Sequence, residues 1–134
     1  MIAFLFALLA FTAPIKPAPQ PPVVVYVASA CAPVTVTYAT ADGSEQDQGS
    51  ADWFAVEPLT PGRFYYLSAQ KSQPGDCMLS ASILVATLPA SVPPAKVGDY
   101  AVTHGQQEAG SYSTAPFGIA TVHWTAPAQT SGSS

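Results

Sequence analysis

Charged residues are scarce in this 134-residue sequence, and the scarcity limits the partners that the protein can recognise. Only 9% of the residues are charged, against about 25% in an average soluble domain. The four cations, Lys16, Arg63, Lys71 and Lys96, are scattered along the chain, and the formal net charge is −4. Because binding to nucleic acid requires clustered Lys and Arg that neutralise phosphates, we expect no nucleic-acid partner.

Residues that carry catalysis or bind metals are also few. His104 and His123 are the only histidines, and the sequence has no nucleophile elbow, phosphate-binding loop or dinucleotide fingerprint. Asp52 and Glu57 flank a short predicted strand at odd spacing, which directs their carboxylates to opposite faces rather than into an acid pair. We therefore predict no enzyme activity, no catalytic residues, no metal site and no cofactor. Asn is absent altogether, which excludes N-linked glycosylation.

An uninterrupted apolar run occupies residues 1–13. It is too short to cross a hydrocarbon core of about 30 Å as a straight helix, and it fits the apolar centre of a secretory signal. No Lys or Arg precedes the run, and Phe11 and Pro14 stand where a cleavage site favours other residues, so an uncleaved membrane anchor is the alternative. Either arrangement exports the residues that follow.

Prolines dominate residues 14–22, which predicts a stiff polyproline-type spacer of about 3 Å per residue. At the other end of the chain, residues 126–134 are rich in Gln, Ser, Thr and Gly, a composition typical of a disordered tail. The sequence is thus divided into a signal peptide or anchor (1–13), a spacer (14–22), one folded domain (23–125) and a tail (126–134).

Alternating apolar and polar residues predict β-strands in the folded domain. In residues 34–40, Val and Tyr alternate with Thr, which buries one face of a strand, and Asp42-Gly43 then provides a tight hairpin turn. The predicted strands cover residues 23–28, 34–40, 44–48, 52–56, 64–70 and 77–87. Residues 100–103 and 118–124 form weaker edge strands, and the stretch between them is predicted as a loop.

This pattern is typical of an all-β fold, a small antiparallel β-sandwich around one hydrophobic core. The aromatic side chains of Trp53, Tyr65, Tyr66 and Trp124 either pack in that core or line a groove for a partner. We assign Tyr66 to the core, and Trp53 and Tyr65 to contact with a partner. The predicted core consists of Val24, Val34, Val36, Tyr38, Phe54, Phe64, Tyr66, Leu67, Leu79, Ile83 and Val85.

Cys31 and Cys77 are the only cysteines. In an exported chain, an even count favours one disulfide, and two independent thiols are the alternative. A bridge between them would stabilise the domain by about 4 kcal/mol, because it closes a long loop in the unfolded chain. The cysteines do not suggest a metal site, since the sequence has no Cys-x-x-Cys motif and no His near either one.

Several short motifs follow one another in a characteristic order, at residues 25–27, 34–46, 52–53, 64–70 and 75–77. The most specific are Tyr-Leu-Ser-Ala-Gln at 66–70, the Trp before it, and Cys77 after a Gly turn. In this order the motifs resemble those of the MmpS-type small membrane proteins, which are accessory subunits of MmpL-type lipid and siderophore exporters of the resistance-nodulation-division class. The resemblance covers about residues 23–85.

The resemblance implies an immunoglobulin-like β-sandwich that is tethered to the cell membrane on its extracytoplasmic face. It also implies a membrane protein as partner, specifically a transporter, and contact of the N-terminal segment with the membrane. The alternative is a secreted or surface-structural immunoglobulin-like domain that has no role in transport.

Overall fold

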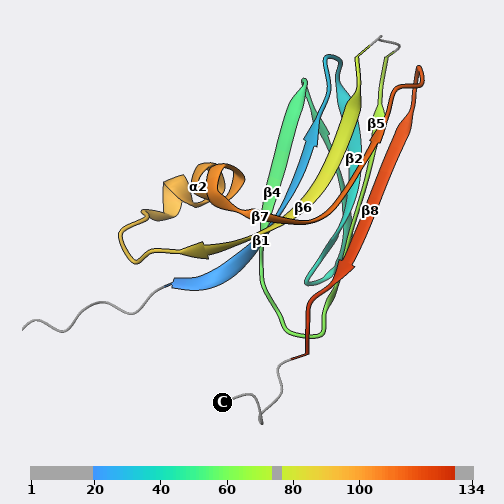
Figure 1. The fold of residues 1–134 in the computed structure, drawn as a ribbon. Helices are drawn as coiled ribbons and strands as arrows, with labels where there is room; N and C mark the ends of the chain where they lie inside the picture. The colour runs from blue at the N-terminus through green and yellow to red at the C-terminus, as the bar shows by residue number, and fades with distance from the viewer. Residues whose placement is uncertain (1–19, 74–76, 129–134) are drawn as a thin grey trace, which may run out of the picture.

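The computed structural model describes residues 20–73 and 77–128, which form two four-stranded antiparallel β-sheets packed face to face (Figure 1). The first sheet has the strand order β4-β1-β6-β7, and the second sheet has the order β3-β2-β5-β8. The predicted all-β sandwich is therefore confirmed. The strands are β1 (Gln20–Ser29), β2 (Val34–Thr40), β3 (Gly43–Gly49), β4 (Asp52–Pro58), β5 (Phe64–Lys71), β6 (Leu79–Leu88), β7 (Gln106–Ser113) and β8 (Ile119–Thr125).

The predicted hairpin after β2 is present and joins β2 to β3. Thr40 pairs with Gly43 across a two-residue connection, Ala41 and Asp42. Gly43 has a φ of 135°, a backbone conformation that residues with a side chain rarely adopt. The Asp-Gly pair thus sets the register of the hairpin, as its sequence predicts.

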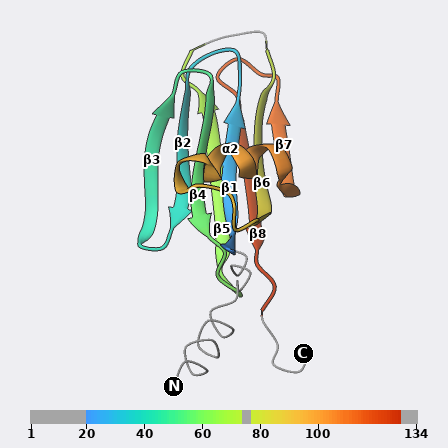
Figure 2. The same ribbon diagram turned by 90° about the vertical axis from the view of Figure 1, so that its left-hand side faces the viewer.

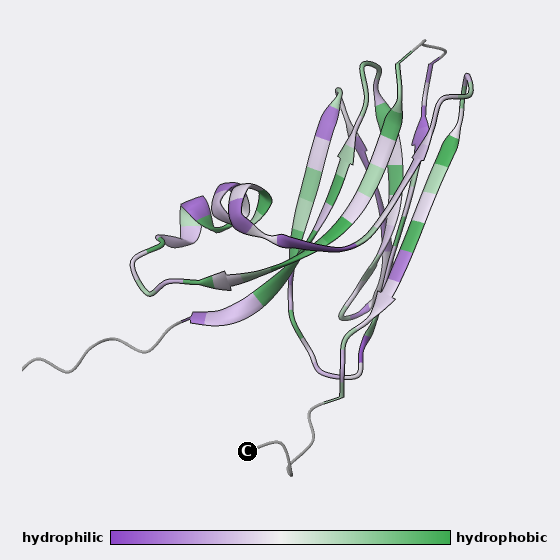
Figure 3. Ribbon diagram, viewed as in Figure 1, coloured by the Kyte–Doolittle hydropathy of each residue, from purple (hydrophilic) through white to green (hydrophobic). Residues whose placement is uncertain are grey.

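The core lies between the two sheets and is formed by alternate residues of β1, β2, β5, β6 and β8, together with Trp53 of β4 (Figure 3). Tyr26 of β1 occupies its centre, with ring centroids 5.5 Å from Tyr38 and 6.3 Å from Tyr65. The prediction is confirmed for the buried residues Val24, Val34, Val36, Tyr38, Leu67, Leu79 and Ile83.

The predicted core is wrong for two phenylalanines, because Phe54 is 46% and Phe64 is 52% exposed. Tyr66 and Val85 are only partly buried. The pairing register shows which face of β5 points to the core. Leu67 lies opposite the buried Tyr38, and directly opposite residues share a face. Tyr65, Leu67 and Ala69 therefore point inward and Phe64 and Tyr66 outward. Both faces of β5 carry apolar residues, so the alternation alone did not distinguish them.

A helix replaces the edge strand that was predicted at residues 100–103. A 3₁₀ turn, Pro94–Lys96, leads into α2 (Val97–His104). The helix lies across the outer face of the first sheet (Figure 2), where Ala101 packs in a second apolar cluster with Val25, Ala86 and Leu88. Glycine at position 98 permits this close approach, because a Cβ there would overlap the ring of Phe54.

The stretch that was predicted as a loop before residue 118 forms β7. This strand pairs with β6, with a register shift between Ile83 and Leu84. Its sequence, Gln-Gln-Glu-Ala-Gly-Ser-Tyr-Ser, has no apolar alternation because most of the strand is exposed. The segment is a strand because its backbone pairs with β6. The amino-acid composition of the segment does not reveal this pairing.

The ends of the folded domain differ slightly from the prediction. Strand β1 begins at Gln20, so the last three residues of the predicted spacer belong to the sheet. Ala126, predicted as the first residue of the tail, is buried and exchanges backbone hydrogen bonds with Gly62 and Arg63. The predicted signal or anchor, the spacer up to residue 19 and the tail from residue 129 lie outside the described residues. Within the described ranges, no helix is both long and apolar enough to cross a membrane.

Candidate binding site at the disulfide end

One end of the sandwich collects several unusual features, and we call it the disulfide end. It consists of residues 30–33, 71–73, 77–78 and 114–119. The strand pairings place these residues together, because Ser29 pairs with Ser80, Lys71 with Val34, and Ile119 with Gln70. Gln20, where the described chain begins, lies at the opposite end of β1.

Cys31 and Cys77 form a disulfide, as the sequence predicts. Their Cα atoms are 5.7 Å apart, a separation typical of such bridges. The backbone N–H of Cys31 also donates to Sγ of Cys77 at 2.7 Å. The bridge joins the connection after β1 to the segment before β6, and it restricts both loops.

Lys71 is the one charged side chain that is fully buried among the described residues, at 1% exposure. Its Nζ donates to the carbonyl oxygen of Cys77 at 2.9 Å, and its backbone N–H donates to the carbonyl of Gly118 at 3.3 Å. Burying an ammonium group is costly unless it is hydrogen-bonded. Lys71 therefore holds the loop that carries the disulfide and the loop before β8 in one arrangement.

Phe117 stands in the loop before β8 with a φ of 53°, the only positive φ of a non-glycine residue in the described ranges. The side-chain amide of Gln70 donates to its carbonyl oxygen at 3.3 Å, and Gly118 donates to the carbonyl of Ala115 at 2.9 Å. A left-handed backbone at a residue with a large side chain costs about 1–3 kcal/mol, and such strain is concentrated at functional sites. Despite this cost, the side chain of Phe117 is 51% exposed.

Two more large apolar side chains are exposed at the same end. Met78 follows the disulfide and is 52% exposed, and Ile119 opens β8 and is 57% exposed. Exposed apolar groups on a fixed backbone provide anchors for another macromolecule, since their burial in a complex removes them from water at little cost in chain entropy. The disulfide end is thus the best candidate for a partner contact.

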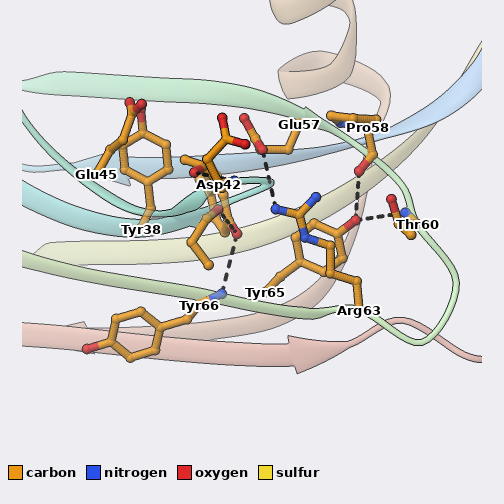
Figure 4. Close-up of polar contacts among 12 residues, drawn as sticks. Tyr38, Asp42, Glu45, Glu57, Pro58, Thr60, Arg63, Tyr65 and Tyr66 are labelled. Atoms are coloured by element: carbon orange, nitrogen blue, oxygen red, sulfur yellow. Dashed lines mark hydrogen bonds and ion pairs between the residues drawn. The ribbon is translucent and has the colours of Figure 1, made fainter.

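The structure corrects the expected contact residues, Trp53 and Tyr65. Trp53 is 7% exposed and donates its indole N–H to Asp47 at 2.9 Å. Tyr65 is fully buried, and its hydroxyl donates to the carbonyl of Pro58 at 2.7 Å and accepts from the N–H of Thr60 at 2.8 Å (Figure 4). Both side chains therefore stabilise the core and its edges. The Tyr65 contact resembles the tyrosine corner of immunoglobulin-like sandwiches.

The ion pair lies at the end of the sandwich opposite the disulfide end, whereas Asp47, whose pKa is shifted, lies on β3 two residues from Gly49, the partner of Val34. Arg63 approaches Glu57 at 3.7 Å and lies over the ring of Tyr65 (Figure 4). The hydrogen bond from Trp53, followed by one from the N–H of Gln48, lowers the pKa of Asp47. These interactions contribute to the packing of the sandwich and not to the candidate site.

The two histidines are far from one another in the fold. His104 stacks on Tyr100 in α2, outside the first sheet, and His123 stacks on Phe64 at the outer face of the second sheet. Among the described residues, no cluster of three or more His, Cys, Asp or Glu is arranged to hold a metal ion. The expectation that the protein is not an enzyme stays a prediction.

No family model matches this chain, and comparison with curated proteins gives no match. The likeness to MmpS-type proteins therefore rests on the order of the sequence motifs.

The sequence did not reveal four residues of the candidate site, Lys71, Met78, Phe117 and Ile119. For Lys71 a signal exists only once the pairing of β5 with β2 is known, since Lys71 then continues the inward-facing positions of Tyr65, Leu67 and Ala69. For Phe117 there was none, because its backbone conformation depends on contacts with Gln70 that no local pattern encodes.

Proposed function

We propose that this protein is a membrane-tethered extracytoplasmic binding domain without enzyme activity, which contacts a membrane protein through its disulfide end. The observation that carries the proposal is the exposure of three large apolar side chains at this end. Met78 and Phe117 stand on loops that the disulfide and Lys71 hold in place, and Ile119 opens β8 next to them. The resemblance to MmpS-type proteins suggests the kind of partner, a lipid or siderophore exporter of the resistance-nodulation-division class.

The disulfide and the apolar N-terminal residues support a location outside the cytoplasm. Disulfides persist in oxidising compartments and are rare in the reducing cytosol. A tether that enters at Gln20 would leave the disulfide end, at the far side of the sandwich, free to meet the extracytoplasmic part of a membrane protein.

The alternative is a secreted or surface-structural domain from which the N-terminal segment is removed. Fractionation of cells that produce the chain with a C-terminal tag, followed by N-terminal sequencing, separates the two cases. Membrane-bound protein that starts at Met1 or Ile2 supports a tether, and released protein with a start near residue 18 supports the alternative. Recovery of full-length protein in the soluble cytoplasm would exclude both.

The role of the disulfide end is tested by co-purification from detergent-solubilised membranes. Phe117→Ser removes one of the exposed anchors, and Phe64→Ser is its matched control, because the two side chains are 51% and 52% exposed at different ends of the sandwich. We expect the membrane partner to be lost with Phe117→Ser and retained with Phe64→Ser. Equal recovery with both variants would argue against a contact at this end.

A further inference from the structure

The outer face of the second sheet carries no charged residue. It is formed by the odd-numbered residues of β2 and β8 and the even-numbered residues of β3 and β5, because directly opposite residues share a face. The acidic residues of β3, Glu45 and Asp47, point to the other side, where they accept hydrogen bonds from Tyr38 and Trp53. The face is therefore neutral in a protein whose net charge is −4.

Hydroxyl and amide groups cover the centre of this face. Gln46, Thr37, Ser68 and Thr121 are direct neighbours and form one row across all four strands. The row spans about 14 Å, since neighbouring strands lie about 4.8 Å apart. Ser68 and Thr121 are 3.1 Å apart, and each hydroxyl can both donate and accept hydrogen bonds. This chemistry matches the hydroxyl groups of a neutral sugar chain.

Aromatic rings border the row at one end. Phe64 is 52% exposed and stacks on His123, with ring centroids 5.8 Å apart and an interplanar angle of 29°. Tyr66 lies directly opposite His123 on the same face. Such rings combine apolar area with polar groups, which suits the C–H face of a sugar ring beside its hydroxyls.

Other occupants fit this face less well. The outer face of the first sheet is covered by α2. In the described part of the chain, no element covers the outer face of the second sheet (Figures 1 and 2). A protein partner favours an apolar centre with a polar rim. Here the arrangement is reversed, because the large exposed apolar residues Phe64 and Ile119 lie at opposite ends of a polar centre. An anionic polymer would be repelled by the net negative charge of the protein, which is −4.

From this neutral, hydroxyl-rich face and its aromatic border, we propose that the outer face of the second sheet binds a neutral polysaccharide. Of the three anchors of the disulfide end, Ile119 lies at one edge of this face, whereas Met78 and Phe117 lie outside the strands that form it. The residues tested here, Ser68 and Tyr66, lie outside the disulfide end. The two proposals can therefore fail independently.

Affinity electrophoresis of the purified full chain tests this proposal. The gels contain a soluble glucan, a mannan or a galactan as neutral probes, or a uronic-acid polymer as the anionic probe. We expect at least one neutral polysaccharide to retard the protein and the anionic one not to. Ser68→Asp places a charge in the middle of the row and should weaken binding about tenfold, a typical effect for a central contact. Ser91→Asp, at an exposed position beside α2, is the matched control and should bind normally.

Tyr66→Ala gives a second test that adds no charge, with an equal expected loss. Thermal unfolding of each variant identifies any that fail to fold. The proposal is overturned if no neutral polysaccharide retards the protein, or if Ser68→Asp and Ser91→Asp behave alike. It is also overturned if sedimentation shows self-association that Ser68→Asp abolishes, because a second copy of the chain would then be the occupant.

Discussion

The ammonium group of Lys71 donates a hydrogen bond to the carbonyl oxygen of Cys77 at 2.9 Å, from a side chain that is 1% exposed. This contact joins the inner face of β5 to the loop that carries the disulfide. The backbone N–H of the same residue donates a hydrogen bond to the carbonyl oxygen of Gly118, which follows Phe117 in the chain. One buried lysine thus connects the two loops of the candidate site.

Replacing Lys71 with Met keeps much of the volume of the side chain but removes its charge and its hydrogen bonds. We expect Lys71→Met to lower the free energy of unfolding by about 1–3 kcal/mol, because the carbonyl of Cys77 loses a buried donor. Lys96→Met, at an exposed position, is the control and should change stability little. Urea unfolding measures both, and equal stabilities would contradict the role of Lys71.

Reduction of the disulfide should destabilise the domain by about 4 kcal/mol, since it frees a loop with a sequence separation of 46 residues in the unfolded chain. That is a large share of the stability of a typical domain, so the melting temperature should fall by many degrees. Calorimetry with and without reductant measures the change. The Cys31→Ala/Cys77→Ala variant is the control, because its melting temperature should not respond to reductant.

The assignment of the faces of β5 and β6 predicts opposite outcomes for two truncations. Ile83→Ala should cost about 2–5 kcal/mol, because the side chain is fully buried. Phe64→Ala should cost less than about 1 kcal/mol, because that ring lies largely outside the core. Chemical unfolding of the two variants checks the assignment. A greater loss from Phe64→Ala would mean that the register of β5 is wrong.

Stability should fall at alkaline pH because of two tyrosines. Burial is the main cause that raises the pKa of Tyr26 and of Tyr38 from 10.0 to about 12. Because the folded-state pKa values exceed the unfolded ones, the neutral phenols stabilise the fold fully below pH about 10. This contribution is lost as the pH rises from about 10 through about 12. Unfolding of the Tyr26→Phe/Tyr38→Phe variant across this range should depend less on pH, and an unchanged dependence would contradict the assignment.

The sequence was sufficient where local pattern and tertiary packing agree. The alternation of Val and Thr in β2 and the Asp-Gly turn located the first hairpin, and the two cysteines indicated the bridge. The pattern failed where long-range pairing decides the structure. In β5 both faces carry apolar residues, so only pairing with β2 showed that Tyr65 is buried and Phe64 is not.

The regions after β6 were harder to predict. Helix α2 is only eight residues long and is held by its packing against Val25, Ala86 and Leu88, and β7 is a polar strand held by β6. The candidate site depends on the same kind of information. The burial of Lys71 and the backbone of Phe117 follow from contacts between loops that are far apart in the sequence.

Site-specific photo-cross-linking in intact cells tests most directly whether the disulfide end contacts a membrane protein. A photoreactive benzoylphenylalanine replaces Phe117 in one variant and Phe64 in the other. The two positions have nearly the same exposure, 51% and 52%, and lie at opposite ends of the second sheet. We expect position 117 to cross-link to one integral membrane protein, identified by mass spectrometry, and position 64 not to. The absence of a membrane-protein adduct at position 117, or the same adduct at both positions, would contradict the proposed function.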